Sequence, residues 1–206
     1  MSQTVRKVKA IGSVATEPVS LATARLHLRL DTSGSPPTHP DDALVEALIS
    51  VAREAVESFT ELTVAVNTFQ MKLDYFEDLA INLGTFPVNS ITSIVYVDTN
   101  GANQTLSVND YVLDTFSKPA QIVLAYDKNW PAVRNQLNAV TVTFQAGFTG
   151  NTSPVTNVMP KALRQAMLLT ITDLYENRGA IGSKQNYEIP IMAQYLMAPY
   201  RINMGP

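Results

Sequence analysis

The segment VMPKALRQAMLLTITDLYENR, Val158–Arg178, holds the longest uninterrupted helical pattern in the chain. Its apolar stripe at helical spacing consists of Leu163, Ala166, Met167, Thr170, Ile171, Leu174 and Tyr175. Leu168 and Leu169 widen this stripe to nearly half of the circumference, and a helix this apolar has to be packed on several sides. Pro160 suits the first helical position, and Gly179 suits the end. The rest of the fold therefore has to cover this helix.

The overall composition excludes several classes of protein. The chain has 206 residues, of which 46% are hydrophobic and 16% charged, as in ordinary globular proteins. Its net charge of -3 differs from the strongly positive charge of proteins that bind nucleic acid through its phosphates. The absence of cysteine excludes disulfides and thiolate metal sites. No apolar run approaches the roughly 20 residues of a membrane span. The basic N-terminus lacks the apolar segment of a signal peptide, so we expect neither secretion nor a membrane partner.

Two further helices are predicted before residue 63. Ser20 suits the N-cap of a first helix, LATARLHLRL (21–30), which ends at the proline-rich loop DTSGSPPTHP (31–40). Asp41 suits the N-cap of a second helix that runs to about residue 62. Residues 1–16 hold few large apolar groups, so we expect an extended arm ahead of the first helix.

The second helix is clearly amphipathic. Its apolar residues form one stripe and a second stripe beside it: Leu44, Leu48, Val51, Ala55 and Phe59, then Val45, Ile49, Ala52 and Val56. Its polar side carries Glu46, Ser50, Arg53 and Glu57. Arg53 and Glu57 stand four residues apart, the spacing of a helical ion pair. We expect this polar side to face solvent.

From about Thr63 the hydrophobic period changes from helical to two. TVAVNTFQMKLDYF (63–76) alternates apolar and polar residues, and further short alternating runs follow up to residue 148. The segment from Asp98 to Gly101 has the Asn-Gly pair favoured in hairpin turns. About seven strands with regularly spaced turns predict an antiparallel β unit, either a sandwich or a small barrel.

After a loop, the helix quoted first is followed by a short last helix within IPIMAQYLMAPYRINM (189–204). The predicted fold class is α+β: a four-helix bundle-like domain, made of two N-terminal and two C-terminal helices, with an inserted antiparallel β unit. We expect an arm at 1–16, the bundle at 17–62 plus 155–206, and the inserted β domain at 63–154. The insertion explains why the most apolar helix comes so late, because it divides one bundle.

The sequence offers no catalytic or metal-binding pattern. Its two histidines, His27 and His39, have no partners at ligand spacing, and no G-x-S-x-G nucleophile elbow is present. Gly179, Gly182 and Lys184 have the wrong spacing for a phosphate-binding loop, so we interpret this stretch as a helix end and a hinge. We therefore expect no enzyme activity, no cofactor and no metal.

Aromatic and methionine residues raise two questions about binding. A single tryptophan such as Trp130, in KNWPAV, can stack on a sugar or a base, but a loop plug packed against a sheet is the interpretation we favour. The C-terminal segment is rich in methionine and tyrosine: Met192, Tyr195, Met197, Tyr200 and Met204. Such a segment suits either a last core helix or an adaptable interface.

Several segments, taken in order, resemble the head–tail connector (adaptor) proteins of long-tailed bacteriophages. EPVSLATARLHLRL and DDALVEALISVAREAVESFTEL resemble the opening of that family, and LGTFPVNSITSIVYVDTNGANQTL resembles the β insertion of its larger members. DLYENRG and LMAPYR resemble its second half. The resemblance spans roughly residues 17–202 and rests on the order of the segments. The arm at 1–16 and the loop at 31–40 depart from it.

The resemblance implies a structural, non-enzymatic virion protein of the neck, at the head–tail junction, that assembles in the host cytoplasm. Members form a ring, usually of twelve subunits, that docks under the portal protein and receives a downstream stopper or tail-completion protein. DNA passes through the lumen during ejection without sequence-specific binding. A net negative charge suits a conduit in which DNA has to slide.

The resemblance also implies that the C-terminal segment reaches into the portal. We expect the portal contacts to come from Tyr195, Leu196, Met197, Tyr200, Arg201, Ile202 and Met204. Leu196, Met197 and Ile202 would anchor this contact, and Tyr200 and Arg201 would add polar interactions. Gly179 and Gly182 are the expected hinge on which the segment moves.

Two other functions stay open on the sequence. One is a tail-completion or tail-tube-end protein that uses the β unit for assembly. The other is a carbohydrate-binding module built around Trp130, although no second aromatic residue stands beside it.

Overall fold

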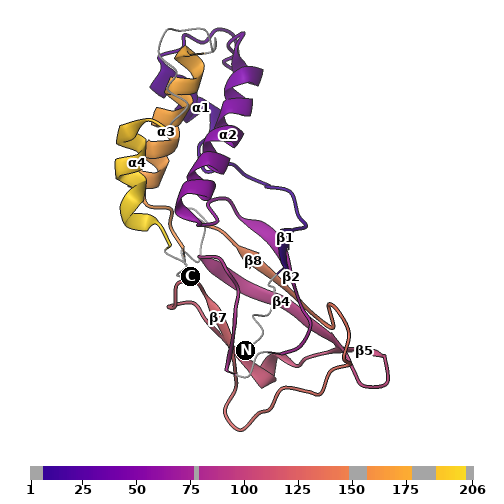
Figure 1. Cartoon of the computed structure of the whole chain (residues 1–206). Coiled ribbons are helices and arrows are strands. Elements are labelled where there is room, and N and C mark those ends of the chain that lie inside the picture. Colours follow the sequence, from indigo (N-terminus) through magenta and orange to yellow (C-terminus); the bar gives the residue numbers. More distant parts are fainter. Residues whose placement is uncertain (1–6, 77–78, 149–156, 178–188, 203–206) are drawn as a thin grey trace. The chain divides into compact units, whose positions relative to one another are not determined.

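The computed structural model describes residues 7–76, 79–148, 157–177 and 189–202. Within these ranges the chain forms four α-helices and two antiparallel sheets, which confirms the α+β class (Figure 1). The chain divides into two compact units. The β unit takes its described residues from 1–15 and 66–148, and the helical unit takes its own from 16–65 and 149–203.

The helical unit is built around its third helix. Its elements are α1 (Leu21–Leu28), α2 (Asp42–Thr60), α3 (Lys161–Glu176), α4 (Ile191–Met197) and a short 3-10 turn, η2 (Ala198–Tyr200). α3 packs against α1, α2 and α4, which confirms that it needs cover on several sides (Figure 1). Its buried residues are Leu163, Ala166, Met167, Leu168, Thr170 and Ile171. Pro160 lies one position earlier than predicted, at the N-cap with an extended backbone, and Gly179 lies outside the described residues.

The buried side of α2 differs from the prediction in one respect. The residues at the centre of its buried face are Val45, Ile49, Ala52 and Val56, which belong to the second of the two predicted stripes. Val51, from the first stripe, is 48% exposed. The polar side was predicted correctly only in part: Glu46 is exposed, but the side chains of Arg53 and Glu57 are largely buried, at 11% and 23% exposed.

The two N-terminal helices begin in different ways. The Ser20 side chain accepts a hydrogen bond from the Thr23 N–H at 3.2 Å, which confirms it as an N-cap. Asp41 occupies the cap position of α2 but makes no capping bond, because its carboxylate accepts from the Tyr175 hydroxyl of α3 at 2.6 Å. The next carboxylate, Asp42, instead accepts from the His39 N–H at 2.9 Å. A contact between helices has replaced the local cap.

The β unit contains a larger and a smaller sheet. The strands are β1 (Lys7–Ala10), β2 (Asn67–Leu73), β3 (Ala80–Asn82), β4 (Val88–Val97), β5 (Asn103–Thr105), β6 (Tyr111–Asp114), β7 (Gln121–Leu124) and β8 (Val140–Ala146), with a 3-10 turn η1 (Val108–Asp110). The five-stranded sheet has the order β1-β2-β8-β4-β5, and the three-stranded sheet has the order β3-β7-β6. The last strand, β8, therefore lies in the middle of the larger sheet.

Both sheets contribute to one hydrophobic core. Met71 and Phe144 enter it from the larger sheet, and Ile81 and Ile122 enter it from the smaller one. The predicted hairpin between β4 and β5 is confirmed, with Gly101 at a φ of 90° that a residue with a side chain rarely adopts. Strand β1, from the segment we expected to be an arm, pairs with β2 of the same chain.

Candidate assembly surface

Helix α4 is short and carries no charge. Pro190 stands at its N-cap, and the Gln194 side chain donates to the Ile189 carbonyl at 2.7 Å. From Ile189 to Tyr200 the sequence contains no charged residue. A surface helix of a globular protein ordinarily carries charged or polar residues on its outer side. The outer side of α4 is therefore not adapted to water alone.

The two sides of α4 are unequal in their surroundings. Ala193 and Met197 are fully buried, and α4 packs on α3 and α2. On the other side Ile191 is 82% exposed, Met192 62% and Tyr195 76%. We name these three residues the α4 face. Residues three and four positions apart are neighbours on a helix, so Tyr195 lies beside both Met192 and Ile191 and joins them into one apolar patch.

The chain beyond η2 is attached to the end of α2. The Ile202 N–H donates to the Thr60 carbonyl at 2.9 Å, and the Ile202 side chain is buried. The Arg201 guanidinium lies over the Phe59 ring, 5.7 Å from its centroid, in a cation–π contact. Residues 198–202 are thus held in place by the helical unit itself.

The seven predicted portal-contact residues divide into three groups. Tyr195, Tyr200 and Arg201 are exposed, and Leu196 is half-buried. Met197 and Ile202, the expected anchors, are buried in the helical unit of their own chain. Met204 and the hinge glycines, Gly179 and Gly182, lie outside the described residues.

Two residues of the α4 face, Ile191 and Met192, were missing from the predicted contacts, although the signal was present. Ile191 begins an uncharged helix, and it shares a side with Tyr195 four residues later. A helix with no charged residue on any side is a pattern that sequence reasoning could have used. The sequence did not show which side of α4 packs inward.

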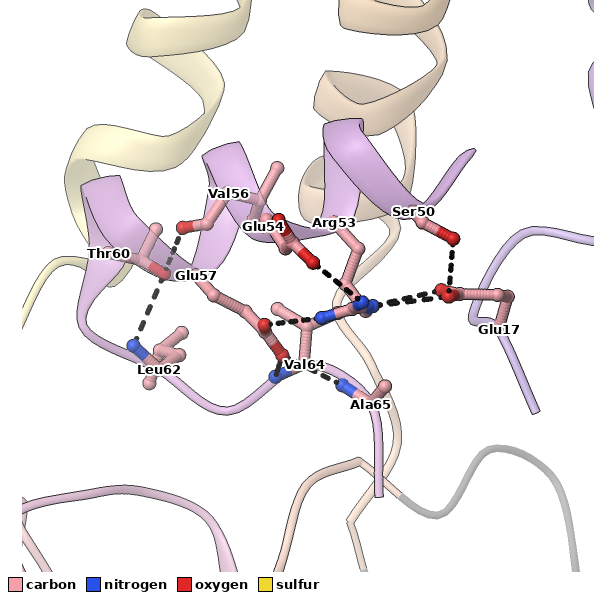
Figure 2. A network of polar contacts seen from close by, with 10 residues as sticks. All are labelled: Glu17, Ser50, Arg53, Glu54, Val56, Glu57, Thr60, Leu62, Val64 and Ala65. Carbon is pink, nitrogen blue, oxygen red and sulfur yellow. Dashed lines mark hydrogen bonds and ion pairs between the residues drawn. The ribbon is translucent and has the colours of Figure 1, made fainter. Parts of the chain in front are cut away.

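A polar network joins two segments outside the helices to α2, as Figure 2 shows. Arg53 Nε donates to Glu17 Oε2 at 3.0 Å, and Arg53 Nη1 donates to Glu57 Oε2 at 2.8 Å. The other oxygen of Glu57 accepts from the N–H groups of Val64 and Ala65, at 2.8 and 3.2 Å. One arginine thereby fixes the chain that leads into the helical unit and the chain that leaves it.

The electrostatics of this network are those of a structural ion pair. Burial lowers the pKa of Arg53, but the carboxylates of Glu57 and Glu17 outweigh it and hold the pKa above its usual value. Ser50 Oγ also donates to Glu17, at 3.1 Å. Each of the two carboxylates thus accepts hydrogen bonds from at least two donors.

Of the two histidines, His39 makes a local structural contact. His39 Nδ1 accepts from the Asp41 N–H at 3.0 Å, next to the start of α2. His27 lies half-buried on α1. Across the part of the chain that the structure describes, no group of three or more histidine, cysteine, aspartate or glutamate residues could hold a metal ion. A search of the same residues finds no helix long and apolar enough to span a membrane.

Trp130 is half-buried at the edge of the hydrophobic core of the β unit. Its ring stacks on Phe76, with centroids 4.7 Å apart and planes 3° from parallel. It also packs against the core that the two sheets share. This confirms the interpretation of Trp130 as a loop plug and removes the residue on which a carbohydrate site was argued.

Comparisons with known proteins bear on the fold. No family model matches this chain, and no curated protein matches it in sequence. A chain in the neck of an empty GTA particle, computed with C6 symmetry, is 22% identical with a TM-score of 0.74, over 95% of both chains. A chain in the virion of a native gene transfer agent (GTA) particle is 22% identical with a TM-score of 0.72, over 94% of both.

A third similar chain comes from the neck of a native GTA particle computed with C12 symmetry. It is 20% identical with a TM-score of 0.71, over 95% of this chain and 94% of that one. At such identities the likeness is one of fold. Nearly the whole chain, with its helical parts and its β unit, has the fold found in these GTA chains.

Proposed function

We propose that this protein is a structural component of a virion neck, an adaptor that joins the portal to the downstream neck or tail components. The observation that carries the proposal is the likeness of fold, over 95% of the chain, to a chain from the neck of a GTA particle. The order of sequence segments that resembles head–tail connectors points the same way, and it is independent of the coordinates.

The proposed assembly is a ring of identical subunits, with twelve as the expected number. The similar neck structures were computed with C6 and C12 symmetry, which supports a ring. Cyclic assemblies are built from one heterologous contact repeated around an axis. DNA would pass through the lumen, and a non-enzymatic role agrees with the structural use of His39, Glu17 and Glu57.

The α4 face is the surface that we propose for the portal. Interface cores are depleted of charged residues and enriched in aromatic residues and methionine, and the α4 face combines Ile191, Met192 and Tyr195 without a charge. Tyr200 and Arg201, five and six residues after Tyr195, are also exposed, and we propose that they add polar groups to this contact. Leu196 is half-buried and would contribute at its edge.

Met197 and Ile202 could serve as portal anchors only after leaving their present sites. Ile202 would break its hydrogen bond to Thr60, and Met197 would leave a fully buried position. We propose that Gly179 and Gly182 supply the hinge for such a movement, with Met204 following the segment. Hydrogen exchange on the free protein checks this proposal, because uniformly slow exchange across residues 189–202 would argue for a fixed segment.

The decisive experiment is electron cryomicroscopy of the protein mixed with its portal, with two variants compared. Ile191→Ser combined with Tyr195→Ser makes the α4 face polar. Leu26→Ser is the matched control, since it removes an exposed leucine from α1. We expect the α4 variant to lose portal docking while both variants keep the far-UV circular dichroism of the wild type.

Normal docking of the α4 variant would overturn the assignment of this surface. Density for the protein at the tail end of the particle, away from the portal, would favour a tail-completion protein instead. Point variants are preferable to a truncation after Ala193, because a truncation would also remove the buried Met197 and Ile202.

A further inference from the structure

The five-stranded sheet has an unusual charge composition for a protein of net charge -3. Its strands contain no aspartate or glutamate, and their only charged residues are Lys7, Lys9 and Lys72. Lys7 and Lys9 come from β1 and Lys72 comes from β2. The acidic residues of the β unit that the structure describes thus lie outside the strands of this sheet, in turns and in the smaller sheet.

The strand register places all three lysines on one face. Lys7 is paired with Lys72, and Lys9 is paired with Gln70. Directly paired residues project to the same side of a sheet. The intervening residue Met71 is fully buried in the core, so the lysines lie on the opposite, outer face. Lys7 and Lys9 are exposed and Lys72 is half-buried.

The rest of this outer face is made mostly of uncharged hydrogen-bonding side chains, with the apolar Val95, paired with Thr141, as an exception. The residues that the register aligns with the lysines are Thr68, Gln70, Thr141, Thr143, Gln145, Ser90 and Ser93. Hydroxyl and amide groups, like lysines, donate hydrogen bonds to phosphate oxygens. No aromatic residue is on this face of the described strands, so it offers no platform on which unpaired bases could stack. We name this surface the lysine face.

Protection of a sheet edge explains only part of the pattern. Lysines on edge strands prevent pairing with other chains, and β1 is an edge strand. Lys72, however, is on β2, which is paired on both sides by β1 and β8. A lysine there protects no edge, so its place on the same face needs another reason.

The lysine face is also electrostatically unbalanced. Lys7 and Lys72 stand directly opposite each other, an arrangement that destabilises a sheet when the charges are alike. None of the ion pairs among the described residues includes Lys7, Lys9 or Lys72. Lys7 Nζ instead donates to the neutral Asn138 Oδ1, at 3.3 Å. Asp74, the residue directly after β2, accepts from the Asn138 N–H at 2.8 Å. A polyanion would relieve this repulsion.

We propose that the lysine face binds the phosphate backbone of double-stranded DNA, without reading its sequence. The inference rests on the proposed function, since DNA is the polyanion that a neck conduit meets. It changes the expectation, drawn from the negative net charge, that DNA slides past the protein without being attracted to it. In this proposal the positive charges that contact DNA are gathered on one surface, although the net charge of the chain is negative. Weak, sliding contacts are what lysines on a flat sheet can supply.

The test is the affinity of the full chain for a short duplex of mixed sequence, measured by fluorescence anisotropy as a function of salt. Three lysines that each neutralise one phosphate give a log–log slope near about -2.7, so the affinity per protomer falls about 40-fold between about 50 and about 200 mM salt. The sheet variant replaces all three: Lys7→Gln, Lys9→Gln and Lys72→Gln. We expect it to keep less than about a tenth of the low-salt affinity.

The control variant changes net charge equally but elsewhere: Lys118→Gln, Lys128→Gln and Lys161→Gln. We expect it to bind the duplex nearly as the wild type does. In the absence of DNA, Lys72→Gln alone should raise the Tm by about 1–2 °C, because the repulsion from Lys7 is lost.

Equal losses in the two triple variants, or no binding by the wild type at low salt, would overturn the proposal. Polyglutamate that competes as well as DNA at equal charge would also overturn it, in favour of an acidic protein partner. Ring formation and portal docking are scored separately on the same preparations, so a failure here is distinguishable from a failure of the neck assignment.

Discussion

Replacing Arg53 by methionine tests the polar network that joins the segment before α1 and the segment after α2 to the helix α2 (Figure 2). Methionine keeps most of the apolar stem of arginine, so the change removes the guanidinium with little change in packing. It removes hydrogen bonds to Glu17 and to Glu57, at 3.0 and 2.8 Å. The two carboxylates then lose their shared positive partner.

The expected loss follows from burial. Hydrogen bonds to charged groups contribute about 1.5–3 kcal/mol each, and removing one partner of a fully buried pair costs about 3–5 kcal/mol. The side chain of Arg53 is 11% exposed, but those of Glu17 and Glu57 are 27% and 23% exposed. Water can therefore reach both carboxylates after the change. We expect Arg53→Met to lower the free energy of unfolding by about 2–3 kcal/mol.

Urea denaturation, followed by circular dichroism at a helical wavelength, measures this loss. Fluorescence of Trp130 reports on the β unit in the same samples and localises the effect. The control is Glu54→Gln, because Glu54 contacts Arg53 at 3.4 Å with a side chain that is 69% exposed. An exposed ion pair contributes less than about 1 kcal/mol, so this variant should unfold almost as the wild type does.

Two results would refute this reasoning. One is a loss for Arg53→Met no larger than that for Glu54→Gln. The other is strict additivity in a double-mutant cycle of Arg53→Met and Glu57→Gln, since residues in direct contact should show a coupling energy of at least about 0.5 kcal/mol.

Three further predictions concern the core and the pH dependence. Met197→Ala should destabilise the helical unit by about 2–5 kcal/mol in urea denaturation, and a loss below about 1 kcal/mol would mean that α4 is not packed as described. Trp130→Ala should cost about 3–5 kcal/mol, whereas Trp130→Phe should cost far less, because the buried Trp130 Nε1 has no acceptor among the described residues; equal costs would contradict the stacking on Phe76. The hydrogen bonds from Arg25 lower the pKa of Asp42 below 3.8, so its contribution to stability is complete above that value and is lost as the pH falls through the lowered pKa. Asp42→Asn should therefore flatten the acid limb of the unfolding midpoint, and an unchanged limb would show that this pair does not contribute.

The helices and the strand content could be predicted because they are local properties. The apolar residues of α3 recur with a period near 3.6, and those of β2 recur with a period of two. The Asn-Gly pair at the β4–β5 hairpin also specifies its turn locally. Each of these signals depends on neighbours within a few residues, and each was present in the printed sequence.

The candidate assembly surface could be predicted only in part. The segment rich in methionine and tyrosine was visible, but its period does not say which side of α4 packs inward. Packing on α3 buries Met197 and leaves Ile191 exposed. Which side of α4 is buried therefore depends on contacts with a different helix, and the sequence of α4 alone does not specify it. The ion pair of Arg53 with Glu57 was predicted from their spacing and is present, but the second partner, Glu17, was missed because it comes from another segment of the chain.

The sequence by itself determined which residues share a side of each helix and strand, and it determined the division into helical and β parts. Tertiary structure alone decided that β8 pairs between β2 and β4, and that Lys7 stands opposite Lys72. The physical reason is that periodicity specifies a face but not its partner. Strands and helices far apart in sequence pair only when long loops close and a shared core is buried. The free energy of that step depends on contacts made throughout the chain and not on any one segment.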